Sequence, residues 1–251
     1  MKTPLIVGNW KMYHTLSESL ALVKSIHYGL NYPSNIDIVV TPSFTSLDAV
    51  AQFLGKSFID LGAQNIYFEE LGAYTGEISA AQLKNIGANY VIIGHSERRQ
   101  YFNETDETIN KKIKAAIAHK LTPIVCIGET LEQIESNQTE TIINQQLDNG
   151  FVDLSENDIN TLVIAYEPIG TIGTEKTETP EQAEELHGMI RQKMTKQFNQ
   201  KTANELRILY GGSITPENSK AFLSQPNIDG ALIGDASLNA SDFIAIIHSC
   251  F

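Results

Sequence analysis

The chain has 251 residues, of which 42% are hydrophobic and 19% are charged, a composition typical of an ordinary soluble globular protein. Its formal net charge of −12 excludes the basic surface with which proteins bind nucleic acids or anionic membranes. Because no apolar run has the length of a membrane span, the N-terminus lacks the regions of a signal peptide, and Cys126 and Cys250 do not suggest a disulfide framework, we expect a cytoplasmic protein.

Eight short apolar runs rich in β-branched residues predict eight strands. In chain order they are Leu5–Val7, Ile36–Val40, Phe58–Leu61, Tyr90–Ile93, Thr122–Ile127, Leu162–Tyr166, Leu206–Tyr210 and Gly230–Ile233. Because these runs are almost continuously apolar, they indicate a parallel sheet that is covered on both faces.

Helices are predicted between the strands. Leu16–Leu30 and Thr105–His119 each gather apolar residues on one face, and Thr179-Pro180 and Thr215-Pro216 are typical helix starts. The polar tract Glu129–Asn149 predicts a helix with a solvated face. Eight strand–helix pairs in a chain of this length predict an α/β fold, a single (β/α)8 barrel domain over residues 1–251. The alternative is a doubly wound open sheet, which more often has fewer strands and a nucleotide-type Gly-rich first turn.

Polar residues follow the first and third predicted strands, at the end of a barrel where catalytic groups lie. Asn9 and Lys11 follow the first strand, and the lysine is either a surface residue or a fixed positive charge for an anionic ligand. The third strand is followed by the loop Ile66–Gly76, which contains several apolar side chains. This loop either forms a docking surface or folds back on its own barrel.

His95 follows the fourth strand, at or just before a helix start, where the positive end of the helix dipole favours a neutral imidazole. A neutral imidazole can donate a hydrogen bond to a developing oxyanion, although a lone histidine after a strand is usually structural. Glu97 is either a second acid at the rim or a cap for its own helix. Cys126 lies inside the fifth apolar run, so we expect a core residue and not a nucleophile.

Glu167 is the carboxylate that follows the sixth strand. Pro168 ends this strand, because proline has no backbone N–H for the ladder. A Gly- and Thr-rich segment comes next, and a new helix begins near Thr179. A base, a hinge and a loop that can close as a lid, in this order along the chain, suit proton transfer in an enzyme. A lone Glu at a strand end is nevertheless more often an inert ion-pair partner.

The last two predicted strands both end in glycine-containing turns, Gly211-Gly212-Ser213 and Gly234-Asp235-Ala236. Backbone N–H groups at such turns, next to short helices, bind anions without a charged side chain. Because phosphate binding after the seventh and eighth strands recurs in this barrel, the two turns predict a phosphate site.

Together these residues resemble the triosephosphate isomerase family from end to end. The matching segments are Gly8-Asn9-Trp10-Lys11-Met12, Gly62-Ala63-Gln64-Asn65, Gly72 to Ser79, Gly94 to Arg99, Val125 to Glu129, Ala165-Tyr166-Glu167-Pro168, Tyr210 to Ser213 and Ala236-Ser237-Leu238. The resemblance implies interconversion of dihydroxyacetone phosphate and glyceraldehyde 3-phosphate, in glycolysis and gluconeogenesis, with no metal or organic cofactor.

The resemblance also implies a role for each residue at the barrel's mouth. Glu167 corresponds to the base, His95 to the neutral electrophile that shuttles protons between the two oxygens, and Glu97 to a further active-site acid. Lys11 would supply positive charge, with Asn9 as polar support beside it. The backbone at four positions would hold the phosphate, namely Gly173, Ser213, Gly234 and Asp235.

Two further elements follow from the resemblance. The first is a lid over the active site, formed by Pro168, Ile169, Gly170, Thr171, Ile172, Gly173, Thr174, Glu175, Lys176 and Thr177. The second is a homodimer in which the loop Ile66–Gly76 reaches into the partner, with Thr75 packing near the neighbour's active site.

The chain departs from the family pattern around the lid and the phosphate site. Where the family usually has Trp, Ala, Gly and Ala along and just beyond the lid, this chain has Gly170, Thr171, Glu175 and Glu178, and Asp235 replaces the second Gly of a turn. A flexible residue at the first hinge and a carboxylate beside a phosphate predict a less populated closed lid and weaker phosphate binding. We expect a raised KM and more loss of the intermediate by phosphate elimination, and a KM that differs from that of a Gly170→Trp/Asp235→Gly double variant.

Two other functions fit parts of the sequence. The departures suit a phosphate-binding barrel enzyme of altered substrate, and the fold alone would also suit a non-catalytic binding protein. Retention of Glu167, His95 and Lys11 together argues against the non-catalytic alternative, because binding alone requires none of them.

Overall fold

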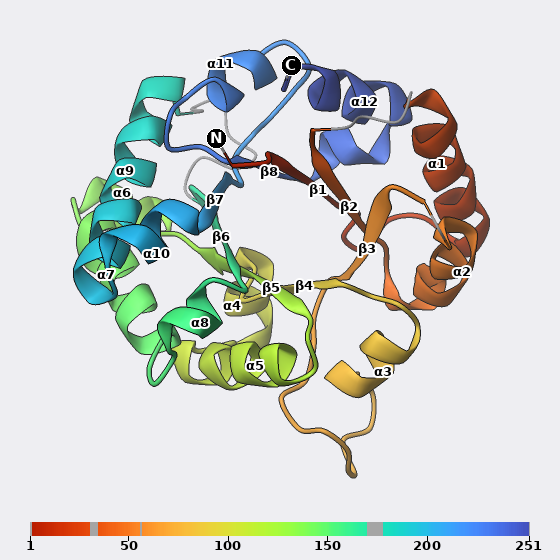
Figure 1. Ribbon diagram of the computed structural model, residues 1–251, viewed down its shortest axis with the longest axis horizontal. Coiled ribbons are helices and arrows are strands. Elements are labelled where there is room, and N and C mark those ends of the chain that lie inside the picture. Colours follow the sequence, from red (N-terminus) through yellow and green to blue (C-terminus); the bar gives the residue numbers. More distant parts are fainter. Residues whose placement is uncertain (1, 31–34, 56, 170–177, 251) are drawn as a thin grey trace.

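The computed structural model describes residues 2–30, 35–55, 57–169 and 178–250, and its centre is a closed barrel of eight parallel strands (Figure 1). Each strand pairs with its neighbours in sequence, and β8 closes the barrel against β1. The strands are β1 (Leu5–Asn9), β2 (Asp37–Thr41), β3 (Ile59–Ala63), β4 (Tyr90–Ile93), β5 (Thr122–Ile127), β6 (Val163–Tyr166), β7 (Arg207–Tyr210) and β8 (Gly230–Ile233). The predicted (β/α)8 barrel is therefore confirmed.

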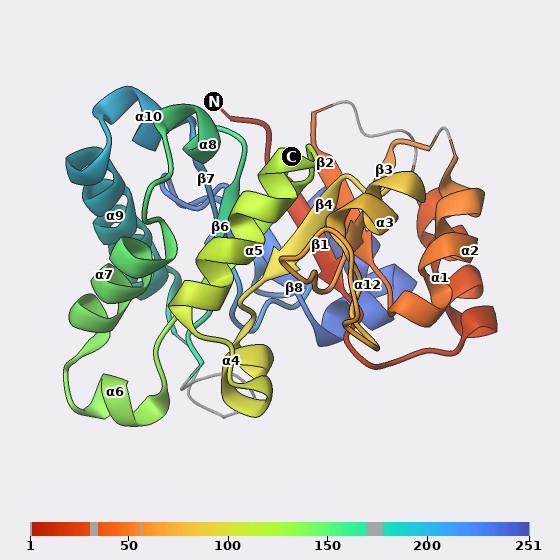
Figure 2. The same cartoon turned by 90° about the horizontal axis from the view of Figure 1, so that it is seen from below.

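Helices surround the strands as an outer ring (Figure 1). They are α1 (Leu16–Gly29), α2 (Phe44–Leu54), α3 (Ala80–Asn85), α4 (Ser96–Phe102), α5 (Asp106–Ala118), α6 (Leu131–Glu135), α7 (Thr139–Gly150), α8 (Glu156–Ile159), α9 (Pro180–Gln197), α10 (Gln200–Glu205), α11 (Ser219–Leu223) and α12 (Ala240–His248), with a 3-10 helix, η1 (Asp235–Leu238). Figure 2 shows α4 and α6, which follow strands, at one end of the barrel, and α8 and α10, which precede strands, at the other.

Alternation along each strand divides the apolar core into two layers. Leu5 and Val7 of β1 belong to a small cluster inside the barrel, whereas Ile6 belongs to the large cluster between strands and helices. Cys126 of β5 is fully buried in the inner cluster, as expected for a core residue. The strands are apolar on both sides because both of their faces are covered.

Strand predictions were correct in number and within two residues at every end. Strands β1 and β3 each end two residues later than predicted, and β1 continues past Val7 to Asn9 because its backbone still pairs with β2, where Asn9 is opposite Thr41. The apolar signal stops earlier than the ladder, since polar residues at the barrel's mouth continue the strand. The helix predicted for 105–119 is confirmed as α5, with Thr105 as its N-cap.

Two helix predictions were wrong in detail. The tract 129–149 forms two helices, α6 and α7, separated by Asn137, whose φ of 55° is left-handed, and α7 buries Ile143 and Leu147. At Thr215, where a helix start was predicted, the chain forms a turn in which the Thr215 N–H donates to the Asn218 Oδ1 at 2.8 Å. Helix α11 begins at Ser219. The start at Thr179 is confirmed, with a capping box and Pro180 in the first turn of α9.

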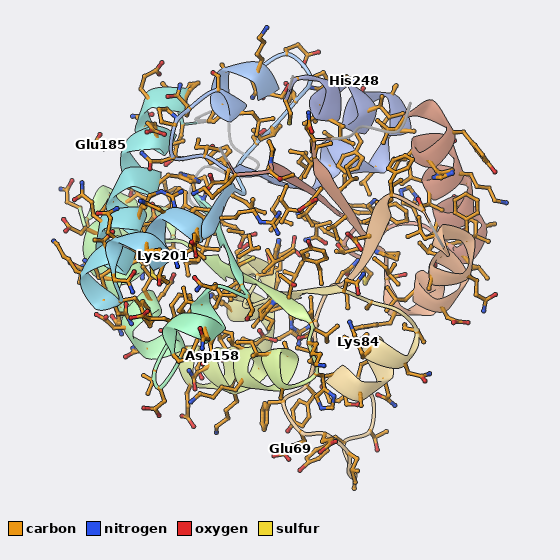
Figure 3. The ribbon with its side chains drawn as sticks, in the orientation of Figure 1. Glu69, Lys84, Asp158, Glu185, Lys201 and His248 are labelled. Atoms are coloured by element: carbon orange, nitrogen blue, oxygen red, sulfur yellow. The ribbon has the colours of Figure 1, made fainter. Side chains whose placement is uncertain are left out.

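The loop 66–76 between β3 and α3 projects away from the barrel (Figure 1), and Glu69 lies near its tip (Figure 3). Leu71 and Tyr74 on this loop are 83% and 42% exposed, so they are not folded back into the core. None of the helices in the described part of the chain is long and apolar enough to cross a membrane.

Candidate active site

A cavity of about 490 Å³ opens at the carboxyl ends of the strands. Most of the predicted site residues line it, namely Asn9, Lys11, His95, Glu97, Glu167, Ser213, Gly234 and Asp235. Ile169 of the predicted lid also lines the cavity, whereas lid residues 170–177, including Gly173, lie outside the described residues. Thr75 is exposed on the loop 66–76 and is not among the described residues that line this cavity.

The strand ladder continues one residue beyond β6 and fixes the backbone of Glu167. Its N–H donates to the Ile127 carbonyl of β5 at 2.8 Å, and the Gly211 N–H donates to the Tyr166 carbonyl at 2.7 Å. A Cβ on Gly211 would lie 2.9 Å from the Glu167 Cγ, so only glycine leaves room for the carboxylate here. The Glu167 residue is only 2% exposed.

His95 is the N-cap of α4 and lies opposite Glu167. Gly94, with a φ of 72°, supplies the left-handed turn between β4 and this helix. The His95 Nε2 lies 2.9 Å from the Glu167 Oε1, and the Ser96 backbone N–H donates to the Glu167 Oε2 at 2.9 Å. Two consecutive residues at one helix start thus hold both oxygens of the carboxylate.

The Glu97 N–H donates to the His95 Nδ1 at 3.3 Å. Because Nδ1 accepts this bond, the neutral imidazole carries its hydrogen on Nε2, which faces Glu167. Burial disfavours the imidazolium, but the charge and hydrogen bond of Glu167, with the charge of Glu97, raise the pKa of His95. Burial likewise opposes the Glu167 carboxylate, but His95 and the Ser96 backbone lower the pKa of Glu167. Neutral His95 stays a prediction.

Lys11 projects toward the same cavity from the loop after β1. Its φ of 49° is left-handed, a conformation that costs about 1–2 kcal/mol for a residue with a Cβ. The Lys11 N–H donates to the Asn9 Oδ1 at 3.1 Å, and the Gln64 side chain donates to the Lys11 carbonyl at 2.9 Å and to the Thr41 carbonyl at 2.9 Å. Gln64, which directly follows β3, therefore holds this loop in position, a role that the sequence did not reveal.

The Lys11 ammonium lies 2.9 Å from the Glu97 Oε1. Burial disfavours the charge, but the hydrogen bond and charge of Glu97, with smaller effects of Asp235 and Glu167, raise the pKa of Lys11. Its Cε would lie 3.3 Å from a Cβ on Gly234, so the lysine side chain passes beside the turn after β8. A positive charge is therefore present where a phosphate site was predicted.

Asp235 is exposed and opens the 3-10 helix η1. Its backbone is therefore in the right-handed region, and the tolerance of Asp for left-handed backbone plays no part here. On the other turn, Asn218 donates to the Ser213 carbonyl at 3.0 Å, which fixes the chain after β7. In the described part of the chain, no three His, Cys, Asp or Glu side chains are grouped to hold a metal ion.

Comparison with known proteins places this geometry in a family. The family model for triosephosphate isomerase matches residues 4–250. The chain belongs to the triosephosphate isomerase family.

Curated members of the family are similar to the chain over its whole length. The triosephosphate isomerase of Chloroherpeton thalassium is 50% identical over 250 residues, with 99% of each chain covered. That of Clostridium botulinum strain ATCC 19397 is 51% identical over 248 residues, covering 99% of this chain and 100% of the relative. The crystal structure of the Bartonella henselae triosephosphate isomerase superimposes with a TM-score of 0.90 at 38% identity, with 98% of each chain covered. The chain is thus an enzyme of this family.

Proposed function

We propose that this enzyme interconverts dihydroxyacetone phosphate and D-glyceraldehyde 3-phosphate through an enediolate. The observation that carries the proposal is the pairing of Glu167 and His95 at 2.9 Å in a cavity that Lys11 also lines. Proton removal next to a carbonyl needs a base beside the carbon and donors beside the oxygen, and these three side chains supply both.

In this mechanism Glu167 takes a proton from one carbon of the substrate and returns it to the neighbouring carbon. His95 donates from Nε2 to the substrate oxygens, and Lys11 stabilises the negative charge of the enediolate. The 2.9 Å contact between His95 and Glu167 leaves no space for a substrate atom, so substrate must separate them. Separation also removes the carboxylate that raises the pKa of His95, which favours the neutral imidazole.

We further propose that the backbone at Ser213, Gly234, Asp235 and Gly173 binds the substrate phosphate. Lys11 offsets the net charge of −12 locally, which otherwise repels an anionic substrate. The exposed Asp235 carboxylate weakens this attraction, and the proposed lid over residues 168–177, with Gly170 at its hinge, keeps water from the enediolate once closed. No metal ion or organic cofactor takes part in this proposal.

The chain is also proposed to be one cytoplasmic barrel domain over residues 1–251 that acts as a homodimer through the loop 66–76. Leu71 and Tyr74 are exposed, and the Tyr67 ring contacts Phe68 at 4.3 Å and Tyr74 at 4.8 Å. These apolar side chains on an exposed loop support docking on a second copy.

A coupled isomerase assay tests the proposed reaction. We expect turnover of both triose phosphates by the wild type and a loss of about 10² to 10⁴-fold in kcat for Glu167→Ala. Absence of turnover in the wild type would reject the isomerase, in favour of another phosphorylated substrate. Equal turnover in wild type and Glu167→Ala would reject Glu167 as the base.

A further inference from the structure

The hydroxyl of Tyr166, the last residue of β6, contacts two carboxylates at once. It lies 3.0 Å from the Glu129 Oε1, just after β5, and 3.2 Å from the Glu178 Oε1, just before α9. A phenol has one hydrogen and can donate to only one of them. The second contact is a hydrogen bond only if the other carboxyl group carries a proton and donates to the phenol oxygen.

Each of the two carboxyl groups has a second hydroxyl group beside it in addition to Tyr166. Glu129 is 1% exposed, and its Oε1 also faces the Thr139 hydroxyl at 3.3 Å, so two hydroxyl groups can stabilise its charge. Glu178 is partly buried and has the Tyr210 hydroxyl beside it in addition to Tyr166. The Oε2 atoms of both glutamates are buried and have no hydrogen-bond partner among the described residues. Since Tyr166 can donate to only one of the two carboxyl groups, ionisation of both would leave one buried charge without this hydrogen bond.

Among the described residues around this pair, no basic side chain offsets its charge. The cavity of about 820 Å³ beside it, between α7 and α9, is lined by Glu129, Glu140, Glu178 and Glu185, and none of its described lining residues is basic. Both tyrosines stay protonated, because burial raises their pKa values. His187 of α9, which contacts the rings of Tyr166 and Tyr210, stays neutral because burial lowers its pKa.

The direction of the carboxyl pKa values agrees with this geometry. Burial, opposed by the tyrosine hydroxyl groups and reinforced by the charge of Glu129, raises the pKa of Glu178 to about 7. Burial also raises the pKa of Glu129, against the hydrogen bonds from Tyr166 and Thr139. The pair therefore retains a proton at pH values where an ordinary glutamate has lost it.

We propose that Glu178 and Glu129 share one proton across the Tyr166 hydroxyl, which makes Glu178 a positioning residue that fastens the start of α9 to the end of β6 beside Glu167. When that proton is lost, two carboxylates repel each other across one phenol, and the connection loosens. The effect of this connection on turnover rests on the proposed role of Glu167 as the base, whereas the shared proton does not rest on it.

The shared proton is tested by ¹³C NMR of the glutamate side-chain carboxyl carbons between pH 4 and 9, with the Glu178 signal assigned by its absence in Glu178→Gln. We expect a Glu178 midpoint near pH 7 in the wild type and a fall of about one unit in Glu129→Gln, which removes the neighbouring charge. Glu185→Gln is the matched control, because Glu185 lines the same cavity but points outward from α9 (Figure 3), and it should leave the midpoint unchanged. A wild-type midpoint below about 5, the ordinary range of a glutamate, would overturn the proposal, as would a Glu178 midpoint unaffected by Glu129→Gln.

The positioning role is tested by the ratio of kcat/KM between wild type and Glu178→Gln as pH rises. The glutamine amide can donate to the Tyr166 oxygen at every pH and so copies protonated Glu178. We expect the ratio of wild-type to Glu178→Gln kcat/KM to be constant below pH 6 and to fall several-fold above pH 7. The kcat/KM of Glu185→Gln should change with pH as that of the wild type does. A ratio independent of pH, with a Glu178 midpoint near 7, would overturn the positioning role. Absence of turnover in every variant would count against the proposed reaction and leave the NMR result intact.

Discussion

At the scale of single residues, Asp235 and Lys11 determine the charge where we propose that phosphate binds. Asp235 is exposed, yet its carboxylate is close enough to contribute to the raised pKa of Lys11. A phosphate bound at the same turn would share Lys11 with this carboxylate and be repelled by it. Because water screens an exposed carboxylate, the expected penalty is moderate, about 0.5–1 kcal/mol.

Asp235→Asn is therefore expected to lower KM by about two- to fivefold at low ionic strength and to leave kcat nearly unchanged. Asp48→Asn on α2 is the matched control, since it removes the same charge from an exposed position outside the cavity. Steady-state kinetics at two salt concentrations checks the prediction. Equal KM values for wild type and Asp235→Asn would show that the carboxylate is irrelevant to substrate binding.

Single residues were predictable where a strand end made them conspicuous. Glu167 and His95 each follow an apolar run, so the strand pattern alone places both at the mouth of a barrel. The Ser96 N–H and the Gln64 side chain complete the site, but their partners are 71 and 53 residues away in sequence. Such contacts depend on tertiary packing, which a local pattern does not encode.

At the scale of elements, Lys112 connects α5 to the start of the exposed loop. Its ammonium donates to the Asn65 Oδ1 at 2.7 Å and pairs with Glu104, which also pairs with Arg98. Lys112 is 4% exposed, so its loss would leave a buried Glu104 with one partner fewer. The loop after β3, helix α4 and helix α5 thus meet in one buried ion-pair network.

Lys112→Met is expected to lower the free energy of unfolding by about 2–4 kcal/mol, since a buried carboxylate loses a partner. Lys111→Met is the matched control, because Lys111 is an exposed neighbour in an i,i+4 pair with Glu107, and it should cost less than about 0.5 kcal/mol. Urea unfolding of both variants checks the prediction. A similar loss in the two variants would contradict a special role of the buried network.

The contact between α9 and β6 predicts a dependence of stability on pH. Because burial raises the pKa of Glu178 to about 7, the folded protein binds this proton more tightly than the unfolded chain does. Stability relative to Glu178→Gln is then greatest below the ordinary pKa of a glutamate and is lost as pH rises through about 7. We expect a loss of about 1–2 kcal/mol between pH 5 and 8 from paired urea titrations, and an unchanged difference would contradict the raised pKa.

Element boundaries were predictable only where the apolar residues and the backbone pairing stop at the same residue. This holds for β4, β5 and β8. It fails at 129–149, because a left-handed Asn137 interrupts a continuous polar tract, and polar side chains on either side give no sign of the break. The departure at Glu178 was visible in the sequence, but its contact with Tyr166 was not.

At the scale of the whole molecule, the loop 66–76 projects from an acidic barrel and exposes the apolar side chains of Leu71 and Tyr74. We expect a dimer in sedimentation velocity and mostly monomer for Thr75→Arg, which places a charge on the proposed interface. Thr161→Arg, at an exposed position just before β6 and so at the other end of the barrel, is the matched control and should remain a dimer. A dimer that survives Thr75→Arg would exclude this part of the loop from the interface.

The central claim is that Glu167 moves a proton between two adjacent carbons of the substrate. The most direct measurement is ¹H NMR of glyceraldehyde 3-phosphate formed from dihydroxyacetone phosphate in D2O. A carboxyl group exchanges its proton with solvent, so we predict deuterium at C2 of the product, formed about 10² to 10⁴-fold more slowly by Glu167→Gln. A product free of deuterium, formed at the same rate by both proteins, would contradict the account.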